Sequence, residues 1–99
     1  MIPTDSATPA QVKRYGAYTQ SRAGRVGVPQ GPRGMLFAAD LVGTSAQIAE
    51  TLTSSRAFGE VDEVAFALPF SFERDDYLQI LGDIAGALAP RLGWRPAAV

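Results

Sequence analysis

The chain has 99 residues and a mass of 10.5 kDa, which suits one domain and falls far short of the roughly 250 residues of a complete (β/α)8 barrel. Its 46% apolar content predicts a folded chain, and nine basic residues against ten acidic ones predict neither a nucleic-acid partner nor a membrane partner. The chain contains no Cys and no His. Their absence excludes disulfides, thiolate catalysis, Ser–His triads and most transition-metal sites.

The first residues carry no targeting signal. They lack the basic and apolar segments of a secretory leader, and no stretch of the chain approaches the roughly 18 consecutive apolar residues of a membrane span. We therefore expect a cytoplasmic protein. Residues 1–7 are polar and contain a proline, which predicts a disordered tail. Met1 is compatible with a true start and with a start codon inside a truncated gene.

A helix is predicted over residues 8–22. Thr8 is a capping residue, Pro9 suits the first helical position, and Gln11 is placed to reach back to the cap. Residues 24–34 follow as a loop, because six of these eleven positions are Gly or Pro. Arg25 and Arg33 in the loop suggest a phosphate cradle, but the spacing matches no established phosphate motif, and we interpret the loop as a flexible surface connection.

A short extended segment is expected near residues 35–43, and Thr44 and Gln47 then repeat the capping pattern of a helix that runs to about Ser54. The next element is a buried parallel strand over residues 63–68, since apolar residues occupy both of its alternating faces. One strand cannot pair its own N–H and C=O groups, so this one needs neighbours from elsewhere. The order of elements predicts an α/β fold.

The last helix is predicted over about Arg74–Ala89, and it opens with an acidic group formed by Glu73, Asp75 and Asp76. Paired carboxylates can perform acid–base chemistry or hold Mg²⁺, and the same charges also complement the helix dipole. A second acidic group, at Glu60, Asp62 and Glu63, is interpreted as a solvated turn.

Aromatic residues concentrate in the last third of the chain. We interpret them first as core and interface packing, with stacking on a flavin or a nucleobase as the alternative; they are Phe66, Phe70, Phe72, Tyr77 and Trp94. Phe70 and Phe72 follow the carboxyl end of the predicted strand, where α/β folds place ligand sites.

The order of several short motifs resembles the C-terminal end of luciferase-like flavin-dependent monooxygenases. The motifs are Leu41-Val42-Gly43-Thr44, Val61–Pro69, Tyr77-Leu78-Gln79-Ile80-Leu81, Ala89-Pro90 and Leu92-Gly93-Trp94. A bacterial branch of FMN-dependent members ends in a similar pattern, ALPFxFxxxDYxQIL…APxLGW. The resemblance covers about residues 8–96. Each motif is moderately specific, and their shared order is more so.

This resemblance implies a (β/α)8 (TIM) barrel that uses reduced FMN, or the deazaflavin F420 in other branches, with dioxygen. The chain would be a single partial domain in which residues 35–99 supply the last barrel units, with residues 63–68 as the eighth strand. The family's flavin-binding segments have no counterpart here, so no catalytic or cofactor-binding residue is named, and no cofactor is expected on the chain alone. Phe70 and Ser71 match the loop beyond the last strand and would line the pocket of a complete barrel.

Two functions remain open. The first is a C-terminal fragment of such a monooxygenase, inactive alone, whose partner is the remainder of the barrel. The second is a small non-catalytic α/β module that dimerises or docks on a partner protein through its exposed strand edge. A self-sufficient enzyme would have to depend on the carboxylates described above.

Overall fold

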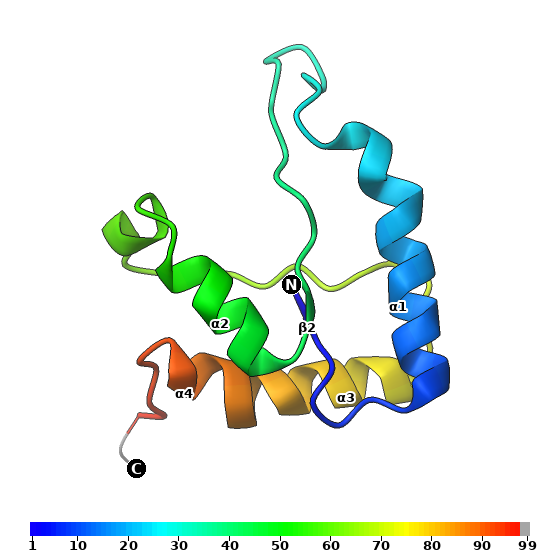
Figure 1. The fold of residues 1–99 in the computed structure, drawn as a ribbon, viewed down its shortest axis with the longest axis vertical. Coiled ribbons are helices and arrows are strands. Elements are labelled where there is room, and N and C mark those ends of the chain that lie inside the picture. The colour runs from blue at the N-terminus through cyan, green and yellow to red at the C-terminus, as the bar shows by residue number, and fades with distance from the viewer. Residues whose placement is uncertain (98–99) are drawn as a thin grey trace.

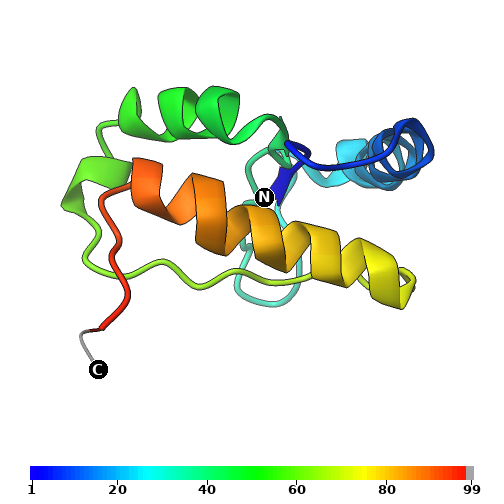
Figure 2. The same cartoon turned by 90° about the horizontal axis from the view of Figure 1, so that it is seen from below.

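The computed structural model describes residues 1–97, so the last two positions of the predicted barrel units, 98 and 99, lie outside the described residues. The strands are β1 (Ile2–Pro3) and β2 (Val42–Gly43), and the helices are α1 (Pro9–Arg22), α2 (Ser45–Thr53), α3 (Arg74–Asp83) and α4 (Ala89–Arg91). Short 3-10 turns occupy Ala23–Arg25 and Phe58–Glu60. In Figure 2, α2 lies on one side of the α3–α4 helix, and the chain around residues 60–70 crosses the other.

Both predicted helix starts are confirmed. The N–H of Gln11 donates to Oγ1 of Thr8 over 3.2 Å, and the N–H of Thr8 donates to Oε1 of Gln11 over 2.9 Å. Thr44 and Gln47 form the same reciprocal pair at the start of α2. Each pair satisfies backbone donors that the first helical turn leaves free, so both starts are dictated locally.

The last helix runs without a break, but its winding changes at one turn. A π-helical turn at Ile84–Leu88 joins α3 to α4, where the N–H of Ala89 donates to the carbonyl of Ile84. Pro90 follows at once, and a proline ring crowds the preceding turn and has no N–H to donate. The widened turn therefore lies where proline makes regular α-helical bonding impossible.

The amino-terminal segment is not a disordered tail, and that prediction is wrong for β1. Ile2 and Pro3 are buried and pair in parallel with Val42 and Gly43. The N–H of Ile2 donates to the carbonyl of Leu41 over 2.7 Å. The polar residues after β1 bond to distant helices: Asp5 accepts from Ser45 at the start of α2, and Ser6 donates to Asp83 at the end of α3.

Residues 63–68 do not form the predicted buried strand, and this prediction is wrong. They run extended across the molecule in Figure 1, but in the described chain residues 62–68 make no backbone–backbone hydrogen bond. A strand needs a neighbour, and the parallel sheet here consists of β1 and β2. The α/β class is thus confirmed through a different pair of strands. We call residues 62–68 the unpaired segment.

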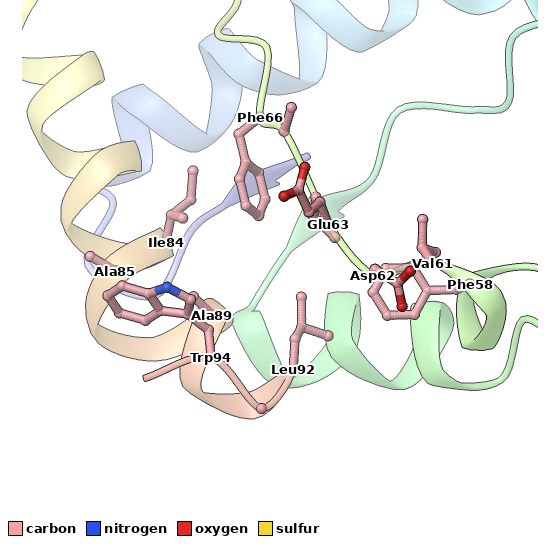
Figure 3. Close-up of a pocket in the computed structure, with 13 residues that line it drawn as sticks. Phe58, Val61, Asp62, Glu63, Phe66, Ile84, Ala85, Ala89, Leu92 and Trp94 are labelled. Carbon is pink, nitrogen blue, oxygen red and sulfur yellow. The ribbon is translucent and has the colours of Figure 1, made fainter. Parts of the chain in front are cut away.

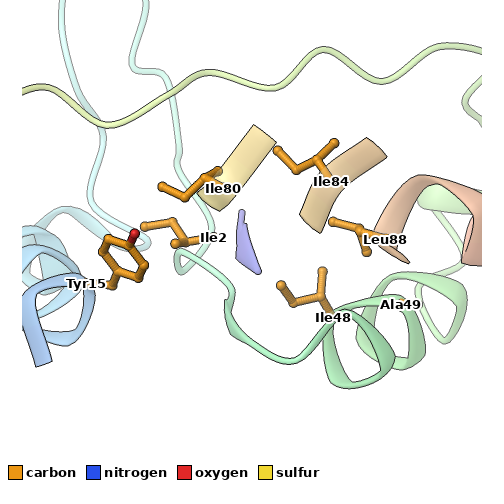
Figure 4. Packing of buried hydrophobic residues seen from close by; sticks show 7 residues of the cluster. All are labelled: Ile2, Tyr15, Ile48, Ala49, Ile80, Ile84 and Leu88. Atoms are coloured by element: carbon orange, nitrogen blue, oxygen red, sulfur yellow. The ribbon is translucent and has the colours of Figure 1, made fainter. Parts of the chain in front are cut away.

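The core is small and gathers around β1 (Figure 4). Its members are apolar and buried: Ile2, Tyr15, Ile48, Ala49, Ile80, Ile84 and Leu88. From the unpaired segment only Phe66 and Leu68 pack partly against this core, whereas Val64 is 40% exposed. The segment therefore has one face on the protein and its remaining surface open.

Candidate functional site

Two cavities lie along the unpaired segment. The larger has a volume of about 670 Å³ and is bounded by residues 61–66 on one side and by the end of the last helix on the other. Figure 3 shows Phe66 on the extended chain, opposite Ile84 and Ala85 on the helix. The smaller cavity, about 310 Å³, lies along residues 65–70 and reaches Ile2. Open space therefore accompanies the segment along its whole length.

The structure separates the two residues that were predicted to line a pocket. Phe70 is 82% exposed and borders the smaller cavity, beside Arg22 and Asp40. Ser71 borders neither cavity. Its φ of 65° lies in the left-handed region, which is costly for a side chain with a Cβ and marks the sharp turn into α3.

The remaining aromatic residues divide between packing and cavity walls. The ring of Phe72 lies 5.2 Å from that of Tyr15 and 5.3 Å from that of Tyr18, so this residue packs α1 against the start of α3. Trp94 is half exposed and borders the larger cavity. Sequence reasoning did not find this cavity, although the aromatic concentration in the last third pointed to this part of the chain.

In the acidic group at the start of α3, Asp76 has a structural role, whereas Glu73 and Asp75 are exposed. Asp76 is 1% exposed, and its Oδ1 lies 2.6 Å from Nη1 of Arg14. Burial acts to raise the pKa of Asp76, but hydrogen bonds from the Glu73 N–H and the Gln11 amide, together with Arg14, lower the pKa below its ordinary value. A carboxylate that is buried and paired in this way is unsuited to acid–base exchange with a substrate.

A hydrogen-bond network continues from Asp76 across the core. The hydroxyl of Tyr15 donates to Oε1 of Gln79 over 2.6 Å, and Nε2 of Gln79 donates to Asp83 and to the carbonyl of Pro3. Asp83 also accepts bonds from the N–H and the hydroxyl of Ser6, both over 2.8 Å. Burial, helped by the charge of Asp76, raises the pKa of Tyr15 to about 12, so its hydroxyl stays a neutral donor.

The second acidic group is open to solvent. Glu60, Asp62 and Glu63 are exposed, and the last two border the larger cavity. Of the described residues that line this cavity, two are acidic and none is basic. Within residues 1–97 there is also no group of three acidic residues placed to hold a metal ion together.

The glycine-rich loop folds as an irregular hairpin that projects from the body in Figure 1. Gln30 and Met35 exchange two backbone hydrogen bonds of 2.8 Å, and Gly31 and Gly34 adopt the positive φ angles that such tight turns favour. The guanidinium of Arg25 lies 4.7 Å from the centre of the Phe37 ring. The glycines thus serve turns, and Arg25 packs on an aromatic ring, so the phosphate-cradle interpretation finds no support here.

No protein-family model, no curated protein and no solved structure matches this chain. In the part that the structure describes, no helix combines the length and the apolar character needed to cross a bilayer. Neither cavity holds a cluster of catalytic groups among the described residues. The feature that remains to be explained is the unpaired segment, whose backbone N–H and C=O groups make no backbone–backbone hydrogen bond in the described chain, together with the two cavities beside it.

Proposed function

We propose that this chain is the C-terminal portion of a luciferase-like flavin-dependent monooxygenase, an incomplete (β/α)8 barrel that is inactive alone. The observation that carries the proposal is the unpaired segment, an apolar β-type sequence without a sheet. Barrel strands are buried on both faces and hydrogen-bonded on both edges, so such a segment is suited to a barrel. The ordered motifs from Leu41 to Trp94 support the same family.

The proposal assigns the chemistry to parts of the barrel that this chain does not contain. Reduced FMN, or the deazaflavin F420, would supply the electrons for dioxygen chemistry in the complete protein. Phe70 and Ser71 would then lie at the carboxyl end of the eighth strand, where a barrel places its pocket. The partner of this chain would be the remainder of the barrel.

The residues present do not fit a flavin cofactor by themselves. A flavin phosphate needs cationic side chains or free N–H groups. The larger cavity offers two carboxylates and, among its described lining residues, no Lys or Arg. In the smaller cavity Arg22 is already engaged, since its Nε lies 2.8 Å from Oδ2 of Asp40. We derive no catalytic step from this chain.

The DNA upstream of the Met1 codon tests the proposal. An in-frame stretch coding for roughly 150 further residues, the difference between this chain and a barrel of about 250, would support it. Upstream DNA that codes for no further barrel units in any reading frame would contradict it. Titration of the purified chain with FMN and with F420 tests the inactivity, because saturable one-to-one binding would contradict that part.

A second function is favoured by a different observation. The chain assembles its own core around β1, with buried members from α1, α2 and α3. A non-catalytic module that associates through the exposed strand edge is therefore also proposed. Size-exclusion chromatography and thermal melting would favour it if the chain forms a discrete oligomer that unfolds cooperatively.

A further inference from the structure

The larger cavity lies between two parts of the same chain. Residues 61–66 form one wall, and the end of the last helix, with Leu92 and Trp94 after it, forms the other (Figure 3). Its volume of about 670 Å³ falls within the roughly 300–1,000 Å³ of cavities that hold small molecules in proteins. Because both walls belong to this chain, the space between them suits a small molecule rather than a further protein strand.

The wall on the helix side is apolar and ends in an aromatic ring. Ile84, Ala85 and Leu92 carry no polar side-chain atom, and Trp94 is half exposed beside them. Phe66 of the extended chain stands opposite Ile84 and Ala85 in Figure 3 and is partly buried. Walls of this kind favour a ligand with an aromatic or aliphatic body, because its apolar surface leaves water when it enters.

The charge of the cavity comes from the extended wall. Asp62 and Glu63 are exposed and border the space, and no described lining residue is Lys or Arg. Within residues 1–97 the ion pairs use Asp76 and Asp40, so neither cavity carboxylate is neutralised by a cation of the described chain. Carboxylates attract a cation, and the face of a Trp ring, here that of Trp94, attracts one as well. The same carboxylates disfavour an anionic group.

We propose that the larger cavity binds a small organic cation, with an apolar body and one ammonium group. The body lies between Phe66 and the end of the last helix, and the ammonium group lies beside Asp62 and Glu63. The apolar walls and the uncompensated carboxylates are both required for this choice, since either one alone would leave the class of ligand open. The inference depends on neither of the functions proposed above.

Three probes that share one body and differ in charge test the proposal. They are 4-phenylbutylamine, which is cationic at neutral pH, 4-phenyl-1-butanol, which is neutral, and 4-phenylbutyrate, which is anionic. Trp94 is the single tryptophan of the chain, so its fluorescence reports on the cavity wall. We expect the amine to bind saturably, with a dissociation constant of about 0.1–5 mM for a ligand of this size. The alcohol should bind at least about threefold more weakly, and the carboxylate more weakly still.

Substitution of the two carboxylates separates local charge from net charge. D62N/E63Q removes both charges at exposed positions, and the affinity for the amine should fall about 3–10-fold while that for the alcohol changes less than about twofold. E50Q/D75N is the matched control, because it removes two exposed carboxylates that do not border the cavity. This control should keep its affinity for the amine within about twofold of the unsubstituted chain. Urea unfolding verifies that both variants are folded.

A third variant tests the place of binding. Ala85 is exposed on the helix side of the cavity, so A85F fills the space without adding volume to the core. It should weaken the amine and the alcohol alike, by at least about fivefold, because it removes the room for the shared body.

Three results would overturn the proposal. The first is that no probe changes the fluorescence of Trp94. The second is that the amine and the alcohol bind equally well, and the third is that D62N/E63Q and E50Q/D75N weaken the amine to the same extent. None of these results bears on the upstream DNA or on the oligomeric state, so both proposed functions are tested separately.

Discussion

β1 and the unpaired segment are both extended, yet only the weaker sequence forms a strand. β1 is two residues long and includes a proline, but it has a partner in β2, and Gln79 donates to its Pro3 carbonyl. The unpaired segment is longer and strongly apolar, but the described chain offers it no partner. The contrast teaches that β-structure is decided by the available neighbour more than by propensity.

The largest expected effect is the loss of stability when a buried side chain of β1 is shortened. Ile2→Ala should lower the free energy of unfolding by about 2–4 kcal/mol, because Ile2 is 2% exposed at the centre of the core. Val64→Ala, in the unpaired segment, is the matched control and should cost less than about 1 kcal/mol. Urea unfolding measures both. Equal losses would mean that the two regions are equally packed.

The next effect concerns the polar residues that fix β1. Asp83→Ala should cost about 1.5–3 kcal/mol, because Asp83 accepts bonds from Ser6 and Gln79, and its loss leaves these donors without a partner. Asp75→Ala, an exposed change on the same helix, should cost at most about 1 kcal/mol through the helix dipole. Urea unfolding again provides the comparison, and a smaller loss for Asp83 than for Asp75 would contradict it.

The pH dependence of stability tests the contribution of Asp76 to the packed part of the fold. The pKa of Asp76 is lowered in the folded state, so its contribution to stability is fully present above its ordinary pKa of 3.8 and is lost as the pH falls through the folded value. Stability measured from pH 6 downward should therefore drop below about pH 4. Asp76→Asn should flatten this part of the pH profile. An unchanged acid profile in the variant would rule Asp76 out as the source.

The smallest effect belongs to the unpaired segment itself. Ala65→Pro should change the free energy of unfolding of the dilute chain by less than about 0.5 kcal/mol, since no ladder hydrogen bond is present to lose. The same variant should abolish dimerisation at high concentration, because proline removes a donor from the proposed edge. A large loss of stability in dilute solution would mean that the segment is already paired within one copy.

Sequence predicted the features that depend on near neighbours in the chain. Thr8 with Gln11 and Thr44 with Gln47 settle their helix starts within four residues, and both starts are confirmed. The role of β1 could not be predicted in this way, because Ile2 meets Val42 across forty positions. The apolar composition of residues 63–68 predicted a strand, and this prediction is wrong because composition cannot say whether a partner strand exists.

The candidate site shows the same difference between features set by near neighbours in the chain and features set by long-range contacts. That Phe70 and Ser71 line the pocket of a complete barrel stays a prediction; in this chain Phe70 borders the smaller cavity. Ser71, one residue further on, borders neither cavity and has a positive φ of 65° before α3. The larger cavity lies between residues 61–66 and a lining that includes Trp94, a long-range arrangement that no local pattern encodes.

Amide hydrogen exchange on the dilute chain is the most direct measurement of whether residues 62–68 form an orphaned strand. Amides of this segment should exchange at nearly the rate of an unfolded peptide, while those of α2 and α3 are protected. Protection of the segment equal to that of the helices, in a sample shown to be monomeric, would contradict it.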